Sequence, residues 1–242
     1  MRLRLDLQYD GTGFFGWQIQ PDVISVQGTI EDVLTRLNSG SPVEVMGCGR
    51  TDTGVHAFHY VAHCDFSFKG NLTDLKWKMN TMLPSSIAIL SVESAEEHFH
   101  ARFDARFRTY RYFIHQVKSP FEKSFSYYYP HTLDVEAMNK ACSFIIGQKD
   151  FTSFSKLHTD VKTNDCEVTG AMWVKEGDKI YFEITANRFL RNMVRAVVGT
   201  LLLVGEGKIS PEEVAAIIER KDRGEAGRSV PGCGLFLWRI EY

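Results

Sequence analysis

The chain has 242 residues, of which 44% are hydrophobic and 24% are charged, and these values are ordinary for a soluble globular protein. No apolar run reaches the roughly 18 residues that a membrane span needs, and the first residues alternate apolar and charged side chains instead of forming a signal-peptide core. We therefore expect a cytoplasmic protein with one large domain or two smaller ones. The formal net charge of −2 counts only mildly against nucleic acid as a partner, because phosphate contacts need a positive surface. The distribution counts more than the sum: over residues 98–118 the only acid is Asp104, and five basic residues there can form a basic groove on a near-neutral protein. They are Arg102, Arg106, Arg108, Arg111 and Lys118.

The first half of the chain predicts six elements in the order β-α-β-β-α-β. Residues 2–9 alternate Leu3, Leu5 and Leu7 with charged or polar residues, which is typical of a half-buried strand. Ser25 is a fair N-cap for a helix over residues 25–38. Further strands are expected near residues 43–48, 58–66 and 87–92, and a second helix near residues 73–82. This order is typical of the split βαβ, or ferredoxin-like, sheet.

The second half predicts helices mixed with antiparallel strands. A strand rich in aromatic residues is expected from Phe107 to Gln116, and Glu176-Gly177-Asp178 predicts a hairpin between strands near 167–175 and 179–186. Residues 120–131 are expected to be irregular, with helices at 133–146, 188–204 and 211–221 and a last strand at 235–241. Ser210 is the expected cap of the last helix. We expect an α+β fold of two packed domains, residues 1–104 and 105–242, each with a mostly antiparallel sheet covered by helices, and an active-site cleft between them.

Gly11, Gly13 and Gly16 follow the first strand at the spacing of a dinucleotide-binding loop. That loop also needs a helix that opens directly after it and an acid about 20 residues further on. Here aromatic residues crowd the loop and the next helix waits until about residue 25. We therefore predict no cofactor site, and interpret the segment as a flexible, aromatic loop beside a functional site. A nucleotide-binding oxidoreductase remains the rival that a cofactor screen would test.

The cysteines and histidines do not indicate a metal or disulfide protein. The five cysteines are odd in number and far apart, so neither a disulfide framework nor a zinc knuckle fits. His56, His59 and His63 have no Asp or Glu at a ligand-like offset, and no metal is predicted.

Asp52 lies in the most informative stretch of the chain, Gly49-Arg50-Thr51-Asp52-Thr53-Gly54-Val55-His56-Ala57. The flanking glycines allow positive φ and the close approach of another backbone or a ligand. A carboxylate in such a turn can act as a nucleophile or a general base, and it can also cap its own backbone. The residues alone leave these alternatives open.

Two further segments carry candidate side chains. On the strand that begins at Phe107, Tyr110 and Tyr112 share a face, and a phenol can stack on a base or exchange a proton. On the helix predicted from residue 188, every fourth residue forms a buried stripe, whereas three arginines share another face. The stripe is Phe189, Met193, Val197 and Leu201, and the arginines are Arg188, Arg191 and Arg195. A core tyrosine and a solvated basic face are the alternatives.

The aspartate stretch resembles the signature of the TruA-type tRNA pseudouridine synthases, except at Thr53, where that family is expected to have a small residue such as alanine. Three later segments resemble the same family in the same order, and so do the segments at residues 9–18 and 100–103. The three are Arg108-Thr109-Tyr110-Arg111-Tyr112, Phe189-Leu190-Arg191-Asn192-Met193-Val194-Arg195-Ala196-Val197-Val198-Gly199 and Pro231-Gly232-Cys233-Gly234-Leu235. The residues between Pro231 and Gly234 depart from the family pattern.

The resemblance implies isomerisation of uridines 38, 39 and 40 in the tRNA anticodon stem-loop by a homodimer that needs neither cofactor nor metal. It makes Asp52 the catalytic residue, and Tyr110 and Arg195 the active-site tyrosine and arginine. Leu235 is expected to pack against the target base, and Arg50 to hold open the space that the base leaves. Sugar-phosphate contacts are expected from six arginines, Arg102, Arg106, Arg108, Arg111, Arg188 and Arg191. A synthase of different RNA specificity and a non-catalytic RNA-binding module remain the alternatives.

Overall fold

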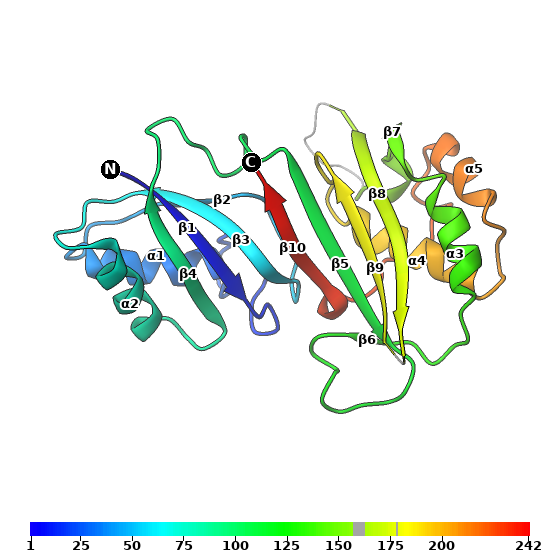
Figure 1. Ribbon diagram of the computed structural model, residues 1–242, viewed down its shortest axis with the longest axis horizontal. Helices are drawn as coiled ribbons and strands as arrows, with labels where there is room; N and C mark the ends of the chain where they lie inside the picture. The colour runs from blue at the N-terminus through cyan, green and yellow to red at the C-terminus, as the bar shows by residue number, and fades with distance from the viewer. Residues whose placement is uncertain (157–162, 178) are drawn as a thin grey trace. The chain divides into compact units, whose positions relative to one another are not determined.

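The computed structural model describes residues 1–156, 163–177 and 179–242. These residues form two compact units, one of residues 1–106 with residues 236–242 and the other of residues 107–235. Both units combine helices with mostly antiparallel sheet, which confirms the predicted α+β class (Figure 1). The end of the chain belongs to the first unit, whereas the predicted boundary at residue 104 and the predicted cleft remain predictions.

The first unit follows the predicted β-α-β-β-α-β order. Its elements are β1 (Arg2–Tyr9), α1 (Val26–Leu37), β2 (Val45–Gly47), β3 (His56–Asp65), α2 (Leu72–Met82), β4 (Ile87–Ser94) and β10 (Leu235–Glu241). β1 pairs antiparallel with β3 on one side and with β4 on the other. β2 pairs antiparallel with one end of β3, and β10 pairs parallel with its other end. The ferredoxin-like order is therefore confirmed, with β10 as an added strand.

β1 separates a buried face of the sheet from a solvated one. Leu3, Leu5 and Leu7 are fully buried, while the residues between them are partly exposed, as their alternation predicts. The buried side chains of α1 and α2 complete this core. α1 begins where predicted because the hydroxyl of Ser25 accepts a hydrogen bond from the N–H of Gly28 at 3.2 Å.

Asp6 lies on the solvated face of β1 and receives hydrogen bonds from three side chains. Arg4 donates to both of its oxygens at 2.9 and 3.0 Å, His59 lies 2.9 Å away, and Ser91 lies at 3.3 Å. Burial raises the pKa of this carboxyl, but the bonds from His59 and Arg4 outweigh burial and lower the pKa to about 2. Because this folded pKa is below the unfolded one, the carboxylate stabilises the fold above about pH 4, and the contribution disappears as the pH falls through 2.

Asp6→Asn is expected to lower the free energy of unfolding at pH 7 by about 2 kcal/mol, the equivalent of the pKa shift. Urea unfolding at pH 7 and pH 2.5 measures it, and the difference between variant and wild type should shrink at the lower pH. Asp65→Asn is the matched control, because Asp65 is also paired with an arginine, Arg2, but its side chain is 67% exposed. The free energy of unfolding should fall less in Asp65→Asn than in Asp6→Asn. An equal loss in both variants at pH 7 would contradict the role of burial.

The second unit is a four-stranded antiparallel sheet in the order β5-β9-β8-β7, with β6 paired parallel to β5. Its elements are β5 (Phe107–His115), β6 (Tyr127–Tyr128), α3 (Val135–Cys142), β7 (Gly147–Asp150), the 3-10 turns η1 (Thr152–Phe154) and η2 (Gly232–Gly234), β8 (Asp165–Glu176), β9 (Lys179–Ala186), α4 (Met193–Gly205) and α5 (Glu213–Arg220). The predicted hairpin between β8 and β9 is confirmed by their antiparallel pairing, although Asp178 lies outside the described residues.

Several predicted boundaries in this unit are wrong. α4 begins at Met193 and not at residue 188, because Asn192 before it adopts φ +66°, a left-handed conformation that interrupts a helix. α3 ends at Cys142, and the unpredicted strand β7 begins at Gly147, whose φ is +103°. α5 begins at Glu213, which exchanges hydrogen bonds with the predicted cap Ser210 in a capping box.

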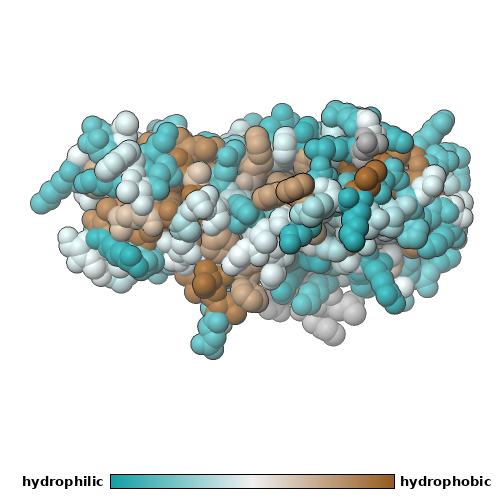
Figure 2. Space-filling view, turned by 90° about the horizontal axis from the view of Figure 1, so that it is seen from below, coloured by the Kyte–Doolittle hydropathy of each residue, from teal (hydrophilic) through white to brown (hydrophobic). Residues whose placement is uncertain are grey.

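On the face drawn in Figure 2, hydrophobic residues occur in small groups among hydrophilic ones. The most exposed large apolar side chains include Phe121 at 90%, Phe103 at 74% and Trp77 at 67%. None of the helices in the described part of the chain is long and apolar enough to cross a membrane.

Candidate active site

Asp52 stands at the first position of a tight turn in the first unit. The N–H of Val55 donates to the carbonyl of Asp52 at 3.2 Å, and Gly54 has φ +72° at the third position, where turns of this kind favour glycine. β3 starts directly after the turn at His56. Asp52 itself is half-buried, while Arg50 and Thr53 are exposed. The turn thus presents a carboxylate at the end of a strand, as the glycines predict.

The residue before the aspartate fixes the turn to the rest of the unit. Thr51 is buried, its hydroxyl lies 2.9 Å from that of Tyr9, and its carbonyl accepts a hydrogen bond from the N–H of Trp17 at 3.2 Å. Tyr60 donates its hydroxyl to the carbonyl of Gly49 and stacks on Trp17, with 4.1 Å between ring centroids. Aromatic side chains from three segments therefore determine the position of the backbone on the N-terminal side of Asp52.

The Gly11–Gly16 loop supports this turn. A Cβ at Gly11 would lie 2.0 Å from the carbonyl oxygen of Val55, and a Cβ at Gly16 would lie 2.3 Å from that of Thr51. Phe14 is buried, and its carbonyl accepts a hydrogen bond from the N–H of Gly54 at 3.4 Å. These glycines are explained by the approach of the aspartate turn and not by a phosphate. The loop does lie beside the predicted site, as expected, but it is bonded to the turn, so the expected flexibility has no support here.

The three histidines of this region have structural partners. His56 accepts a hydrogen bond from the N–H of Gly11 at 3.0 Å, and His59 binds Asp6. His63 accepts from the N–H of Ala101 at 3.1 Å. Across residues 1–156, 163–177 and 179–242, no group of His, Cys, Asp and Glu side chains is arranged to hold a metal ion.

In the second unit, Tyr110 lies on β5 beside Ile184 of β9. Its half-buried ring contacts the ring of Phe189 edge to face, with 5.1 Å between centroids and 88° between planes. Tyr112, on the same face of β5, is fully buried and donates its hydroxyl to the carbonyl of Pro231 at 2.9 Å. Burial raises the pKa of the Tyr112 phenol, so it serves as a neutral structural group.

Arg195 lies in the first turn of α4 and is fastened to Val230 by two hydrogen bonds. Its Nε donates to the carbonyl of Val230 at 2.7 Å, and the N–H of Val230 donates to the carbonyl of Arg195 at 3.2 Å. One turn further along α4, Gly199 allows the chain at Arg228 to pass closely, since a Cβ there would lie 1.9 Å from the carbonyl oxygen of Arg228. The glycine of the predicted motif therefore fixes the 227–230 segment, and that segment fixes the arginine.

Leu235 follows the short turn η2 and is 6% exposed. The glycine before it is required by the contact with β5, because a Cβ on Gly234 would lie 2.7 Å from the carbonyl oxygen of Phe113 and 2.8 Å from the ring of Tyr112. The same turn carries Pro231, the acceptor for Tyr112. Within the second unit, the tyrosine motif and the leucine motif are thus joined directly.

The predicted phosphate-binding arginines have different environments. Arg111 forms an ion pair with Glu183 at 2.6 Å, and the guanidinium of Arg108 donates to the carbonyl of Asn187 at 2.9 Å. Arg102 and Arg106 are exposed in the first unit. Arg188 and Arg191 lie in the loop before α4 and therefore do not share a helix face with Arg195, contrary to the prediction. The predicted buried stripe likewise loses Phe189, whose contact is with Tyr110.

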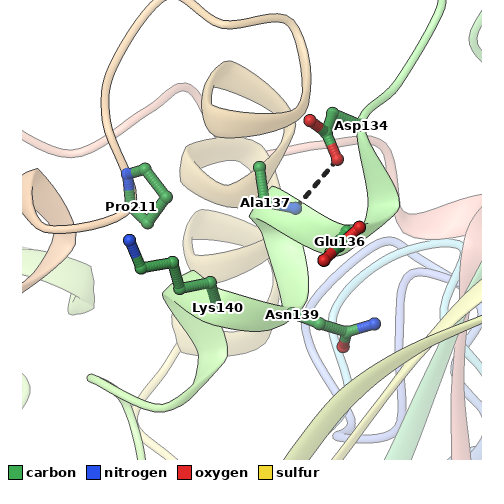
Figure 3. Close-up of a pocket in the computed structure, with 6 residues that line it drawn as sticks. All are labelled: Asp134, Glu136, Ala137, Asn139, Lys140 and Pro211. Carbon is green, nitrogen blue, oxygen red and sulfur yellow. Dashed lines mark hydrogen bonds between the residues drawn. The ribbon is translucent and has the colours of Figure 1, made fainter.

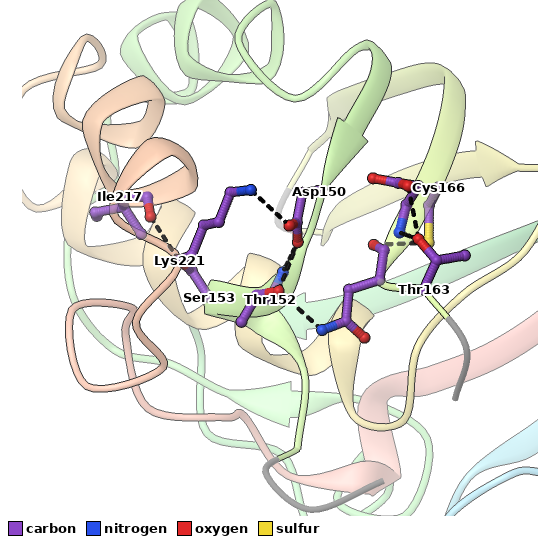
Figure 4. A network of polar contacts seen from close by, with 9 residues as sticks. Asp150, Thr152, Ser153, Thr163, Cys166, Ile217 and Lys221 are labelled. Carbon is purple, nitrogen blue, oxygen red and sulfur yellow. Dashed lines mark hydrogen bonds and ion pairs between the residues drawn. The ribbon is translucent and has the colours of Figure 1, made fainter. Parts of the chain in front are cut away.

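The segment Phe151-Thr152-Ser153-Phe154 contains two buried rings and a polar network (Figure 4). Asp150 accepts hydrogen bonds from the N–H and hydroxyl of Thr152 at 2.9 and 2.5 Å and lies 2.9 Å from the Lys221 ammonium. Burial raises the pKa of Asp150, but these hydrogen bonds outweigh it and lower the pKa. The network ties β7 to the end of α5 and explains the segment structurally.

A pocket at the start of α3 contains none of the predicted site residues. Its lining residues are Asp134, Glu136, Ala137, Asn139, Lys140 and Pro211 (Figure 3). Asp134 caps the helix through the N–H of Ala137 at 2.9 Å, and Lys140 forms an ion pair with Glu212 at 2.7 Å. These side chains are engaged in structural contacts, so the pocket gives no argument for a reaction.

Similarity to known proteins extends over nearly the whole chain. Residues 7–104 and 141–242 match a family model described as tRNA pseudouridine synthase. The chain is 50% identical to tRNA pseudouridine synthase A of Parabacteroides distasonis, over 98% of this chain and 94% of that protein. It is 40% identical to the protein of the same name from Bacillus subtilis, over 100% of this chain and 99% of that protein. The family match includes Asp52, Arg195 and Leu235, whereas Tyr110 falls between its two parts.

Proposed function

The chain belongs to the tRNA pseudouridine synthase family, and we propose that it isomerises uridines 38, 39 and 40 of the tRNA anticodon stem-loop to pseudouridine. The observation that carries the proposal is the match over nearly the whole chain, which includes the aspartate turn. The reaction breaks the N1–C1′ bond of uridine, turns the uracil and joins C5 to C1′. N1 gains a proton and C5 loses one, so no oxidant or reductant is consumed.

In this proposal Asp52 is the catalytic residue. It acts either as a nucleophile at the sugar or as a base there, because a carboxylate suits both roles. The turn that holds it is fixed through Thr51 and Trp17, which supports a role that needs a defined position. Arg195 is proposed to pair with Asp52 and orient its carboxylate, since a guanidinium can bind both oxygens of a carboxylate.

Three further side chains are proposed to handle the base. Tyr110 stacks on the uracil and exchanges a proton, for which its half-exposed ring beside Phe189 is suited. Leu235 seals the pocket, and Arg50 keeps open the space of the displaced base. The base must leave its stack before it reaches a carboxylate, as in other enzymes that act on nucleobases.

The six predicted arginines are proposed to bind the sugar-phosphate backbone, with half-buried Arg188 and exposed Arg191 in the loop before α4 as the test case. Replacing both by alanine should weaken tRNA binding and lower the slope of log affinity against log salt by about 1 per phosphate contact. Titrations at several salt concentrations measure this. Arg36→Ala is the matched control, because Arg36 is exposed on α1 and paired with Asp32 at 2.6 Å. An unchanged slope in the double variant would remove these two residues from the interface.

We further propose that the protein is a homodimer and that it acts on tRNA in the cytoplasm, as the resemblance implies. Sedimentation velocity at micromolar concentration tests the dimer, which a monomer at that concentration would contradict.

The function itself is tested by tritium release from tRNA that carries [5-³H]uridine, because C5 loses its hydrogen when it bonds to C1′. Transcripts with uridine at only one of positions 38, 39 and 40, and cytidine at the other two, resolve the sites. Release from each transcript is expected. Release from a further transcript that has no uridine at position 38, 39 or 40 would indicate a different RNA specificity. No release from any tRNA that the protein binds would indicate an RNA-binding module.

A further inference from the structure

The connection after β4 forms a tight turn that is closed by its own side chains. His100 and Asp104 bond reciprocally: the N–H of His100 donates to the carboxylate of Asp104 at 2.8 Å, and the N–H of Asp104 donates to the carbonyl of His100 at 3.1 Å. Nδ1 of His100 accepts from the N–H groups of Arg102 and Phe103 at 3.2 and 3.3 Å. Four hydrogen bonds thus define a turn of five residues.

Ala101 anchors this turn to the sheet of the first unit. It is fully buried, its N–H donates to Nδ1 of His63 at 3.1 Å, and its carbonyl accepts from the hydroxyl of Tyr242 at 2.7 Å. Burial lowers the pKa of His63 to about 4, so this imidazole is a neutral acceptor near pH 7. Arg4 lies over the ring of Tyr242, 4.9 Å from its centroid. Both peptide groups of Ala101 are therefore held, and the two residues that follow it are presented in a fixed direction.

Those two residues are an arginine and an aromatic ring. Phe103 is 74% exposed although its ring contacts His100, with 4.3 Å between centroids, and the guanidinium carbon of Arg102 lies 5.6 Å from its centroid. The anchored turn carries this ring at the surface of the first unit. The exposed neighbours Arg102, Asp104 and Arg106 are charged, and charged residues are depleted at the centre of protein–protein interfaces. A fixed aromatic ring beside a guanidinium is instead the combination that single-stranded nucleic acid uses, for stacking and for phosphate.

We propose that an unpaired base of bound tRNA, other than the base that is isomerised, stacks on Phe103, and that a neighbouring phosphate meets Arg102. The contact rests on the proposed function, because it takes tRNA as the ligand. Phe103 is then a positioning residue, which helps to place the tRNA without touching the reacting atoms. The structural support is the turn, which orders the ring before RNA arrives and so lowers the entropy cost of binding.

The test compares Phe103→Ala, Phe103→Leu and Phe103→Trp in binding to unmodified tRNA at three salt concentrations. Stacking on an aromatic ring is worth on the order of 5- to 150-fold in affinity, so alanine and leucine should each raise Kd by about 5-fold or more. Tryptophan should restore binding, because it offers a larger flat ring. The salt slope should stay unchanged in Phe103→Ala and fall by about 1 in Arg102→Ala, since only the arginine displaces counterions. Thermal unfolding checks that the variants fold.

Three results would overturn the proposal. An unchanged Kd in Phe103→Ala removes the contact, and full affinity in Phe103→Leu shows that any apolar side chain suffices. Loss of self-association in Phe103→Ala, seen by sedimentation, assigns the ring to a second copy of the chain. Tritium release by the wild type separates the two proposals. If tritium release is absent while the Kd values of the Phe103 variants change as expected, only the proposed function fails. If tritium release is present while these Kd values equal that of the wild type, only the proposed contact fails.

Discussion

Asp52→Asn is expected to reduce tritium release from [5-³H]uridine-labelled tRNA by roughly 10³-fold or more, with tRNA still bound. Losing a general base costs about 10² to 10⁴ in rate, and losing a nucleophile costs more. The amide has the shape of the carboxylate, and the hydrogen bond that closes the turn uses the main-chain carbonyl of Asp52. The substitution should therefore remove the charge and leave the turn intact. Single-turnover release with excess enzyme measures the chemical step directly.

Thr53→Ala is the matched control for Asp52→Asn. Thr53 is the neighbouring residue in the same turn, it is exposed, and it is the position at which the chain departs from the family signature. Its rate should stay within a few-fold of the wild type, because the carboxylate and the bonds of Thr51 are untouched. Equal release by wild type and Asp52→Asn would support the proposed reaction but would show that a residue other than Asp52 is catalytic.

The first unit could be predicted because its signals are local. The alternation in β1 and the Ser25 cap involve residues that are close in the sequence, and both are confirmed. The pairing of β10 with β3 joins Phe236 to His56, which are far apart in the chain. No local pattern indicates such a partner, so the sequence places the last strand in the second domain although it belongs to the first unit.

The start of α4 could not be predicted from periodicity. Phe189 stands four residues before Met193, as it would on one face of a helix, but it contacts Tyr110 from a loop. The deciding feature is the left-handed conformation of Asn192, which asparagine adopts more readily than most residues but does not always adopt. The apolar spacing is therefore compatible with both structures, and only the tertiary contact with β5 distinguishes them.

For the candidate site, sequence reasoning found the residues proposed to act on the substrate and the 9–18 segment beside them, but missed other residues that hold them. Asp52 stands out because the whole stretch around it resembles a family signature, whereas Tyr60 resembles any aromatic residue on a strand. Its hydrogen bond to Gly49 becomes visible only when β3 is placed beside the turn. The same holds for Val230, whose main chain holds Arg195 and whose side chain carries no chemical signal. Supporting contacts made by backbone atoms leave little trace in residue type.

Gly16→Ala is expected to lower the rate of tritium release by about 100-fold and to destabilise the first unit. Gly16 has φ +86°, which costs a residue with a Cβ roughly 1–2 kcal/mol, and its Cβ would lie 2.3 Å from the carbonyl oxygen of Thr51. That carbonyl also accepts the hydrogen bond from Trp17, so the clash displaces the residue next to Asp52 by several tenths of an ångström or more. A misplacement of about 1 Å can cost a factor of about 10² in rate.

Gly13→Ala separates this effect from a general intolerance of the loop. Gly13 lies in the same loop, and its φ is outside the left-handed range. Apart from its chain neighbours, no heavy atom of the described residues lies within 4 Å of the position that a Cβ would take there. Its activity and urea midpoint should match the wild type. Single-turnover rates and urea unfolding of both variants distinguish an effect of the Gly16 contact from a general intolerance of the loop. If Gly16→Ala loses stability but keeps its rate, the loop supports the fold and not the position of the carboxylate. If Gly13→Ala loses as much rate and stability as Gly16→Ala, the loop requires the backbone freedom of its glycines and not the close contact of Gly16 with the turn.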